Sequence, residues 1–214
     1  MRTLRLFCRR LRVPTVIRPE RRMVSWSRRL VLAVVGMVAF EVTDRVRVAS
    51  GATTYEHGLP RATWGWTVCF VGAAVFNAVV IGEIATRLQV GEAPVAGRDR
   101  SAVGACGTYL AAWTLSFALP FERGWAVGFS LVALVATGWA SFEGTLSGLC
   151  IGVAMSTAGP VVEALCVSQR VFHYAEPLRH VWNVPAWLPV LYFSVGIAVV
   201  QLTRAVNHAL RADR

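Results

Sequence analysis

Long apolar segments separated by short polar connections constrain how this chain folds more than any other feature. Six candidate segments have about the length of a membrane span, namely 30–49, 64–86, 101–119, 124–142, 145–168 and 185–203. A helix needs about 20 apolar residues to cross a bilayer core about 30 Å thick. Because backbone polar groups in lipid need internal partners, only helices and closed barrels cross it. The sequence therefore predicts an all-α polytopic membrane protein with six transmembrane helices in a compact bundle.

Composition agrees with this prediction, since 55% of the residues are hydrophobic and only 16% are charged. Such a balance is typical of membrane proteins and not of soluble domains. The expected organisation is a basic cytoplasmic segment at 1–29, a six-helix transmembrane domain at 30–204 and a cytoplasmic tail at 205–214. No separate soluble catalytic domain is expected.

The basic residues are unevenly distributed. Sixteen of the 22 lie in the first 29 residues, in the connection 87–100 and in the segment 204–214; Arg45 and Arg47 are among the few assigned to the opposite side. By the positive-inside rule both termini are expected to be cytoplasmic. The expected location is the cell inner (plasma) membrane. The net charge of +10 is explained by anionic headgroups, which attract each surface arginine by about 1 kcal/mol. Nucleic acid is therefore not an expected partner.

Small residues recur every four positions around the fifth segment, at Gly144, Gly148, Gly152 and Ser156. On a helix this spacing places them near one face, where neighbouring backbones can approach closely. We expect the fifth helix to pack at the centre of the bundle, and the alternative is that the stripe lines a ligand groove. Gly124 and Gly128 leave room for a homo-oligomer, a dimer or a trimer.

Five polar residues fall within or at the rim of the apolar segments: Glu41, Asn77, Glu83, Glu143 and Glu163. A charge at the bilayer centre costs at least about 2.5 kcal/mol, so each needs a partner, a cavity or water. Glu83 and Glu143 are expected near the cytoplasmic edge, where a carboxylate stays hydrated. Glu163 lies deeper and is expected to hydrogen-bond within the bundle.

Motifs of catalysis are not found in this chain. There is no HExxH, Walker loop or dinucleotide fingerprint, and "HYAE" at 173–176 has no second ligand pair for a metal. No catalytic residue, metal or cofactor is therefore expected. A small bundle with few buried polar groups and several aromatic side chains, Trp113 among them, suits an apolar molecule with a polar head.

The second half of the chain, 126–204, resembles the Insig family, six-helix proteins of the endoplasmic reticulum that sense oxysterols and retain an escort protein. "GWASFEGTLSGLCIGV" is similar to the family's block between the fourth and fifth helices, and "VFHYAEP" followed by "AWLPVLYFSVGIAVVQLTR" is similar to its last loop and sixth helix. The matching positions are Trp139, Phe142, Ser147, Gly148, Leu149, Phe193, Ser194, Gly196 and Arg204.

The resemblance implies roles for particular residues. Glu143, with Ser147 beside it, stands where the family has an escort-binding aspartate, and is expected at a polar or partner-facing rim. Gly144 replaces the family's arginine, and Ala126 replaces a glutamine important for sterol sensing. The lysine-free chain looks bacterial, so the resemblance implies a glycerolipid such as diacylglycerol in place of oxysterol. The candidate lipid-binding residues are Tyr109, Ser130 and Trp139, which fall at family cavity positions, together with Asn77 and Trp113.

Three hypotheses follow. The first is a non-enzymatic membrane protein that holds a diacylglycerol-like or sterol-like lipid in an intramembrane cavity open to the bilayer, with a possible membrane-protein partner. The second is a small transporter or channel that uses Glu41, Glu83 and Glu163 as a relay. The third is a structural or escort subunit in which the Gly144 stripe contacts another protein.

Overall fold

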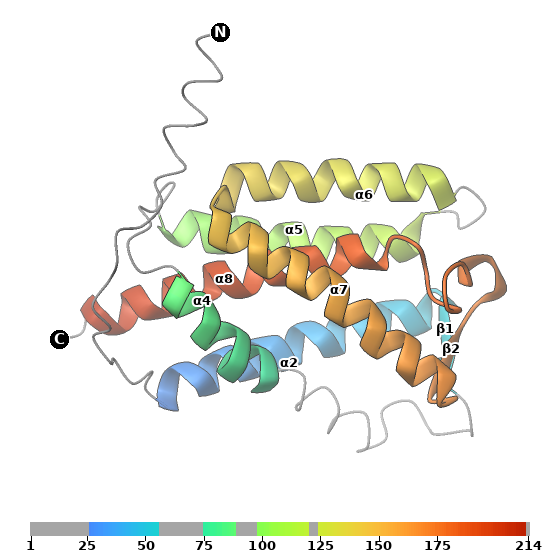
Figure 1. The fold of residues 1–214 in the computed structure, drawn as a ribbon, viewed down its shortest axis with the longest axis horizontal. Coiled ribbons are helices and arrows are strands. Elements are labelled where there is room, and N and C mark those ends of the chain that lie inside the picture. Colours follow the sequence, from blue (N-terminus) through green and yellow to red (C-terminus); the bar gives the residue numbers. More distant parts are fainter. Residues whose placement is uncertain (1–25, 56–74, 89–97, 120–123, 213–214) are drawn as a thin grey trace, which may run out of the picture.

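The computed structural model describes residues 26–55, 75–88, 98–119 and 124–212. Within these ranges the chain is mostly helical (Figure 1). The α-helices are α2 (Trp26–Ala49), α4 (Gly82–Leu88), α5 (Arg98–Ala118), α6 (Gly124–Gly138), α7 (Leu146–Ser168) and α8 (Leu188–Ala212). Two π-helical turns, Asn77–Ile81 and Trp139–Glu143, lead into α4 and extend α6. The strands are β1 (Thr53–Tyr55) and β2 (Phe172–Tyr174).

Three described helices are long and apolar enough to cross a membrane: Gly124–Glu143, Leu146–Ser168 and Leu188–Val206. They coincide closely with the predicted fourth, fifth and sixth segments. The first and third segments fall within α2 and α5. In the second segment, 64–74 lies outside the described residues, and the remainder forms α4 and the π-helical turn before it.

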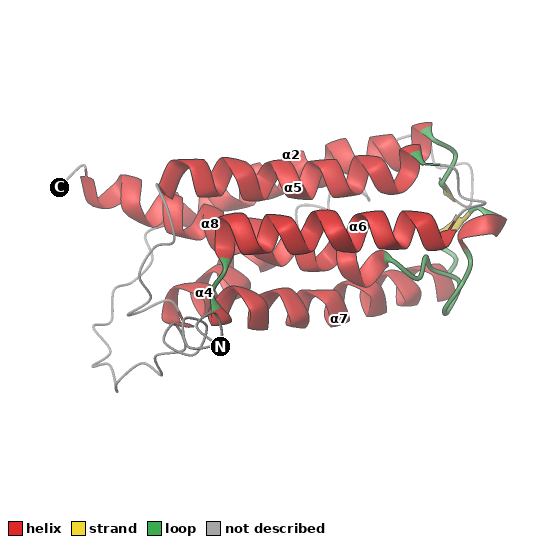
Figure 2. Ribbon diagram, turned by 90° about the horizontal axis from the view of Figure 1, so that it is seen from above, coloured by secondary structure: helices red, strands yellow, loops and turns green. Residues whose placement is uncertain are grey.

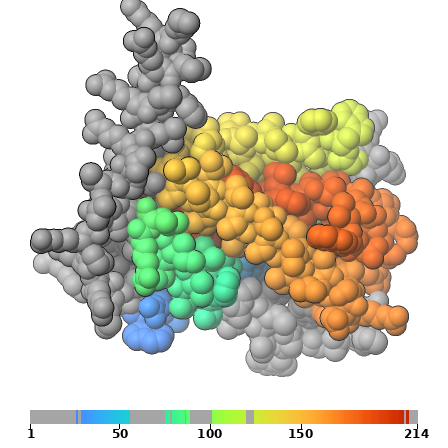
Figure 3. All heavy atoms as spheres, viewed as in Figure 1, coloured from blue at the N-terminus to red at the C-terminus, as the bar shows by residue number. Residues whose placement is uncertain are grey.

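Helix α8 has the most buried span. It packs against α2, α4, α5, α6 and α7, and 50% of its span is buried, compared with 33% for α7. In the space-filling view α7 (orange) instead forms part of the outer surface, running diagonally between α6 and α4 (Figure 3). The expected central position of the fifth helix, α7, is not confirmed.

The small residues of α7 explain why α8 lies so close to it. A Cβ atom on Gly152 would lie 2.6 Å from the Phe193 ring, and one on Gly196 would lie 2.8 Å from the Cα of Gly152. The stripe therefore brings two backbones together at one crossing, as small residues do in membranes. Ser156 is half-buried and donates to the Val153 carbonyl. Gly144 has a different role, since its φ of 58° makes the left-handed turn before α7.

A short antiparallel pair of strands joins the end of α2 to the end of α7. Thr53 lies opposite Tyr174, and Thr54 lies opposite His173. The all-helical prediction did not include this pair, because three-residue strands carry too little alternation to be recognised. The pair lies at one end of the molecule, and the start of α2 and the end of α8 lie at the other (Figures 1 and 2).

Candidate functional site: an apolar cavity between two buried polar clusters

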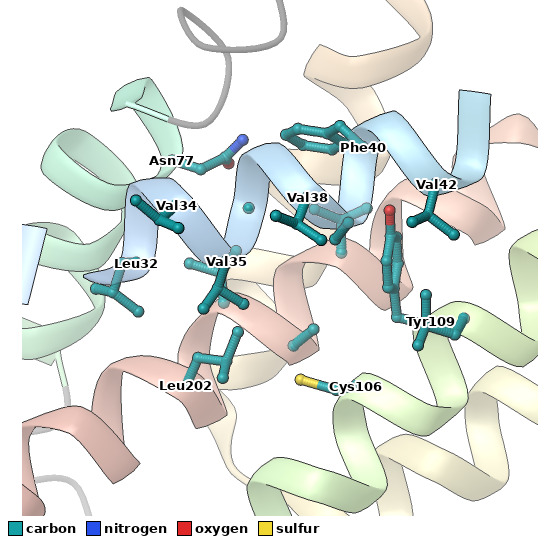
Figure 4. Close-up of a pocket in the computed structure, with 16 residues that line it drawn as sticks. Leu32, Val34, Val35, Val38, Phe40, Val42, Asn77, Cys106, Tyr109 and Leu202 are labelled. Carbon is teal, nitrogen blue, oxygen red and sulfur yellow. The ribbon is translucent and has the colours of Figure 1, made fainter. Parts of the chain in front are cut away.

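An apolar cavity of about 390 Å³ lies between α2, α5 and α8. Helix α2 contributes Leu32, Val35 and Val38 to its wall, α5 contributes Cys106 and Tyr109, and α8 contributes Val195 and Leu202 (Figure 4). Asn77 adds an amide from the π-helical turn before α4. No charged side chain lines the cavity in the described part of the chain. An apolar wall with a few polar groups is the usual form of a small-molecule site.

The hydroxyl of Tyr109 is a polar group in this wall. The Tyr109 side chain extends from α5 toward α2 (Figure 4), and its hydroxyl lies 3.3 Å from Oγ1 of Thr43. Tyr109 is only 5% exposed, so a polar ligand group that reached it would be shielded from water. The cavity therefore combines apolar walls with a buried hydroxyl pair.

The structure brings together only some of the residues that were predicted to bind lipid. Tyr109 and Asn77 line the cavity. Trp113 is buried one turn further along α5, outside the lining. Ser130 lies on the exposed surface of α6, and Trp139 begins the π-helical turn that follows it; neither lines this cavity.

The contribution of α2 was not anticipated. Its lining positions Leu32, Val35, Ala39 and Val42 recur every three or four residues, which is the spacing of one helical face. That signal was present in the sequence. It does not distinguish a cavity wall from an ordinary packed face, because both are apolar.

A buried cluster of Arg47, Glu163, Tyr174 and Tyr192, the Arg47 cluster, lies at the strand end of the bundle. Arg47 donates through Nη1 to Oε1 of Glu163 at 3.2 Å and through Nη2 to Oε2 at 2.9 Å. Tyr192 donates to Oε1 at 2.8 Å, Tyr174 donates to Oε2, and Arg47 also donates to the Tyr174 hydroxyl at 2.5 Å. The predicted hydrogen bonding of Glu163 within the bundle is confirmed.

Aromatic rings surround the guanidinium of this cluster. Its central carbon lies between 5.1 and 5.8 Å from the ring centroids of Trp113, Phe117, Phe172 and Tyr174, within the range of cation–π attraction. Burial raises the pKa of the Tyr174 hydroxyl well above its ordinary value. Arg47 was assigned to a connection, but it lies in α2 and is 8% exposed. A bidentate carboxylate offsets the burial of this charge.

Glu143 belongs to a second buried cluster, near the opposite end of the bundle. Its carboxylate is fully buried and accepts hydrogen bonds from Arg204 at 2.6 Å, from Gln201 and from Thr145. Thr145 caps α7 by accepting from the Gly148 amide at 3.1 Å. A Cβ atom on Gly148 would collide with the Glu143 side chain. The absence of a side chain at position 148 is therefore explained by the space that the Glu143 side chain occupies.

This burial differs from the expected hydrated rim. Glu143 is not presented to water or to a partner within the described structure, because Arg204 and Gln201 of α8 enclose it. Ser147 is also buried, with its hydroxyl 3.1 Å from that of Thr145. The cluster joins the turn between α6 and α7 to the second half of α8.

Comparison with known proteins supports one family. The INSIG protein homolog of Mycolicibacterium vanbaalenii is 28% identical over 181 residues, which cover 82% of this chain and 85% of that protein. The Insulin-induced gene 1 protein of Bos taurus is 25% identical over 83% of this chain, and the match spans 65% of the cattle protein. No protein-family model matches the chain.

Solved structures show the same fold. The mycobacterial Insig homolog MvINS from Mycobacterium vanbaalenii superposes with a TM-score of 0.73 over 85% of this chain and 95% of its own, at 23% identity. A cross-linked trimer of MvINS superposes with a TM-score of 0.75 over 87% of this chain and 97% of its own, at 22% identity. Sequence and fold agree that this chain is a homologue of the Insig proteins.

Proposed function

We propose that this protein is a non-enzymatic membrane protein that holds one uncharged lipid, diacylglycerol-like or sterol-like, in the cavity between α2, α5 and α8. The observation that carries the proposal is the cavity itself, whose wall is apolar apart from groups such as the Tyr109 hydroxyl and the Asn77 amide. An ionised headgroup would meet no counter-charge there, and burying an unpaired charge is strongly unfavourable. An uncharged polar head fits these groups.

The cavity opens toward the bilayer in this proposal. The α2 residues Val34 and Val38 both line the cavity and remain about half exposed, at 47% and 54%. In a membrane such side chains face lipid, so an acyl chain can pass beside them without meeting water. Six helices would cross the inner membrane.

Two observations support cytoplasmic termini. The start of α2 and the end of α8 lie at the same end of the bundle (Figure 1), and the arginine-rich segments 1–29 and 204–214 flank these helix ends. A homo-oligomer is also proposed, since the related MvINS has been solved as a cross-linked trimer. A Cβ atom on Gly128 of α6 would meet nothing within 4 Å, so α6 has room for a second copy.

The relay hypothesis finds no comparable support. Glu41 pairs with Arg45 at 2.9 Å and Glu83 pairs with Arg87 at 3.0 Å, each one turn along its own helix. Glu163 is engaged by the Arg47 cluster. All three carboxylates are therefore paired with arginines and not with one another, as a relay would need.

Mass spectrometry of lipids retained after purification in mild detergent tests the proposal. The wild-type protein should retain one uncharged lipid at near-stoichiometric amounts, enriched over the bulk membrane extract. Ala39→Phe, which places a ring in the cavity wall, should release it. Ala154→Phe is the matched control, because Ala154 lies on the exposed face of α7. A wild-type profile that mirrors the bulk membrane would refute the proposal.

A further inference from the structure

The two halves of helix α2 differ in how they are attached to the rest of the molecule. In the described part of the chain, the side-chain hydrogen bonds that join α2 to other elements come from Thr43, Asp44 and Arg47. Thr43 contacts Tyr109 of α5, Asp44 accepts from Tyr55 of β1 at 2.5 Å, and Arg47 binds α7 and β2 through its cluster. We call residues 43–47 the anchored segment.

The preceding residues 32–39, the wall segment, have no such attachment to other elements within the described structure. They line the cavity and meet neighbouring elements through apolar side chains, as Leu32 does at Gly82 of α4. Val34, Val35 and Val38 are 40 to 54% exposed. No residue of the wall segment is buried, and low burial without a side-chain hydrogen bond to a neighbouring element is typical of the parts of proteins that open at low free energy. The wall segment is therefore the weakly held side of the cavity.

A candidate bending point lies between the two segments. Oγ1 of Thr43 is 3.0 Å from the carbonyl oxygens of both Ala39 and Phe40. A threonine that donates to the carbonyl one turn back loosens and bends a helix. Gly36, inside the wall segment, further weakens the helix, by about 1 kcal/mol relative to alanine.

The same threonine connects the bending point to the contents of the cavity. Its Oγ1 lies 3.3 Å from the hydroxyl of Tyr109, which lines the cavity. A ligand hydroxyl or ester that engaged Tyr109 would compete with Thr43 for this group. The Tyr109 hydroxyl would therefore be the hydrogen-bonding partner both of a bound ligand and of Thr43 at the candidate bending point.

We propose that α2 is a hinged wall: residues 43–47 stay anchored while residues 32–39 swing outward to pass a lipid between the bilayer and the cavity. This inference rests on the lipid-binding function proposed above and adds the route of entry. It assigns Thr43 as a positioning residue for the motion and the Arg47 cluster as its fixed end.

Disulfide locking tests the motion in the full chain with its five native cysteines replaced by alanine. Leu32→Cys with Gly82→Cys is designed to join the wall segment to α4, since Cδ1 of Leu32 lies 3.7 Å from a Cβ built on Gly82. Mass spectrometry verifies that the disulfide has formed before exchange is measured. Thr54→Cys with His173→Cys is the matched control, because these directly opposite strand residues join the end that is already fixed. Directly opposite positions of this kind have Cβ atoms at distances close to those a disulfide needs.

The probe is NBD-labelled diacylglycerol, exchanging from phosphatidylglycerol–phosphatidylcholine vesicles into protein reconstituted in the same lipids. Oxidation of the first pair should slow exchange at least about tenfold, equivalent to about 1.4 kcal/mol in the barrier, and dithiothreitol should restore it. The amount of lipid bound at equilibrium should stay unchanged. Oxidation of the control pair should leave the exchange rate as it was.

A second pair of variants needs no disulfide. Thr43→Val keeps the side-chain shape, removes the hydrogen bonds to Ala39, Phe40 and Tyr109 and should slow exchange. Thr108→Val is its control, because Thr108 donates in the same way to Gly104 on α5 at 2.9 Å and lies outside the cavity. Bound probe that exchanges at the wild-type rate in both the oxidised Leu32→Cys/Gly82→Cys protein and Thr43→Val overturns the hinged wall. Absence of bound probe in the wild type would instead refute lipid binding.

Discussion

Arg47 and Glu163, 116 positions apart in the chain, form a bidentate ion pair inside the bundle, with nitrogen–oxygen distances of 3.2 and 2.9 Å. The pair joins α2 to α7, and Tyr174 and Tyr192 add β2 and α8 to the same carboxylate. One acidic side chain therefore gathers four elements at the end of the molecule that carries the strands. Such pairs are sensitive to loss of one partner, since the remaining charge is left buried.

Removing the acid alone should destabilise the protein strongly. Glu163→Ala should lower the free energy of unfolding by about 3–5 kcal/mol, because Arg47 is then buried without a counter-charge. Replacing both partners, as in Arg47→Met with Glu163→Leu, should cost much less. Glu41→Ala is the control, since its pair with the exposed Arg45 should contribute less than about 1 kcal/mol. Unfolding in detergent measures the free energy of unfolding of each variant. Equal losses of stability in the single and the double variant would contradict the view that the unpaired charge of Arg47 causes the loss.

Gly148 should be intolerant of even one methyl group. Gly148→Ala should destabilise the protein, because the new Cβ atom meets the Glu143 side chain. Gly107→Ala on α5 should be neutral or stabilising by up to about 1 kcal/mol, since that Cβ atom meets nothing within 4 Å and alanine favours the helix.

A double-mutant cycle identifies the contact responsible. In the Glu143→Ala background the methyl group at position 148 no longer meets a carboxylate, so Gly148→Ala should cost less than it does in the wild type. The same cost in both backgrounds, measured by thermal unfolding, would assign the effect to another neighbour.

Alkaline pH should destabilise the strand end of the molecule. Burial, reinforced for Tyr55 by the nearby Asp44 carboxylate, raises the pKa of the Tyr55 and Tyr174 hydroxyls above their ordinary values. Their contribution to stability is complete below about pH 10, where tyrosines of the unfolded chain begin to ionise. It is lost progressively as the pH rises above that value, because only the unfolded chain then releases these protons.

Tyr55→Phe and Tyr174→Phe should each make the decline above pH 10 shallower, as followed by circular dichroism during unfolding titrations. Tyr174→Phe should also lower stability at neutral pH, by about 1.5–3 kcal/mol, because it removes a hydrogen bond to a charged group. A decline as steep as that of the wild type in both variants would show that other groups cause it.

The Tyr109 hydroxyl should matter for lipid retention. Tyr109→Phe keeps the ring and removes the polar group, so affinity for a lipid hydroxyl or ester should fall by about 0.5–1.5 kcal/mol. Ser130→Leu should leave retention unchanged, since Ser130 lies on the exposed surface of α6. Mass spectrometry of the retained lipid compares the Tyr109→Phe and Ser130→Leu variants. Loss in Ser130→Leu with full retention in Tyr109→Phe would place the lipid elsewhere.

Much of this protein follows from its sequence alone. The helices α5, α6 and α7 lie close to the bounds that the apolar segments predict, because segment length and hydropathy are local properties. Helix α8 begins near its predicted start but continues to Ala212, into the predicted tail. Gly148 and Gly152 lie in close contacts as the four-residue spacing indicates. The hydrogen bonding of Glu163 also follows, since an acid so deep in an apolar helix cannot remain alone.

Other features depend on which helix faces meet. Arg47 binds Glu163 only because folding places the end of α2 beside α7. Glu143 is enclosed only because α8 brings Gln201 and Arg204 beside it. The cavity wall on α2 has the same apolar pattern as a packed face. The apolar periodicity of a helix indicates which face is shielded from water, but it does not identify the neighbour that shields it. Tertiary structure alone therefore decided the partners of these charges and the position of the cavity.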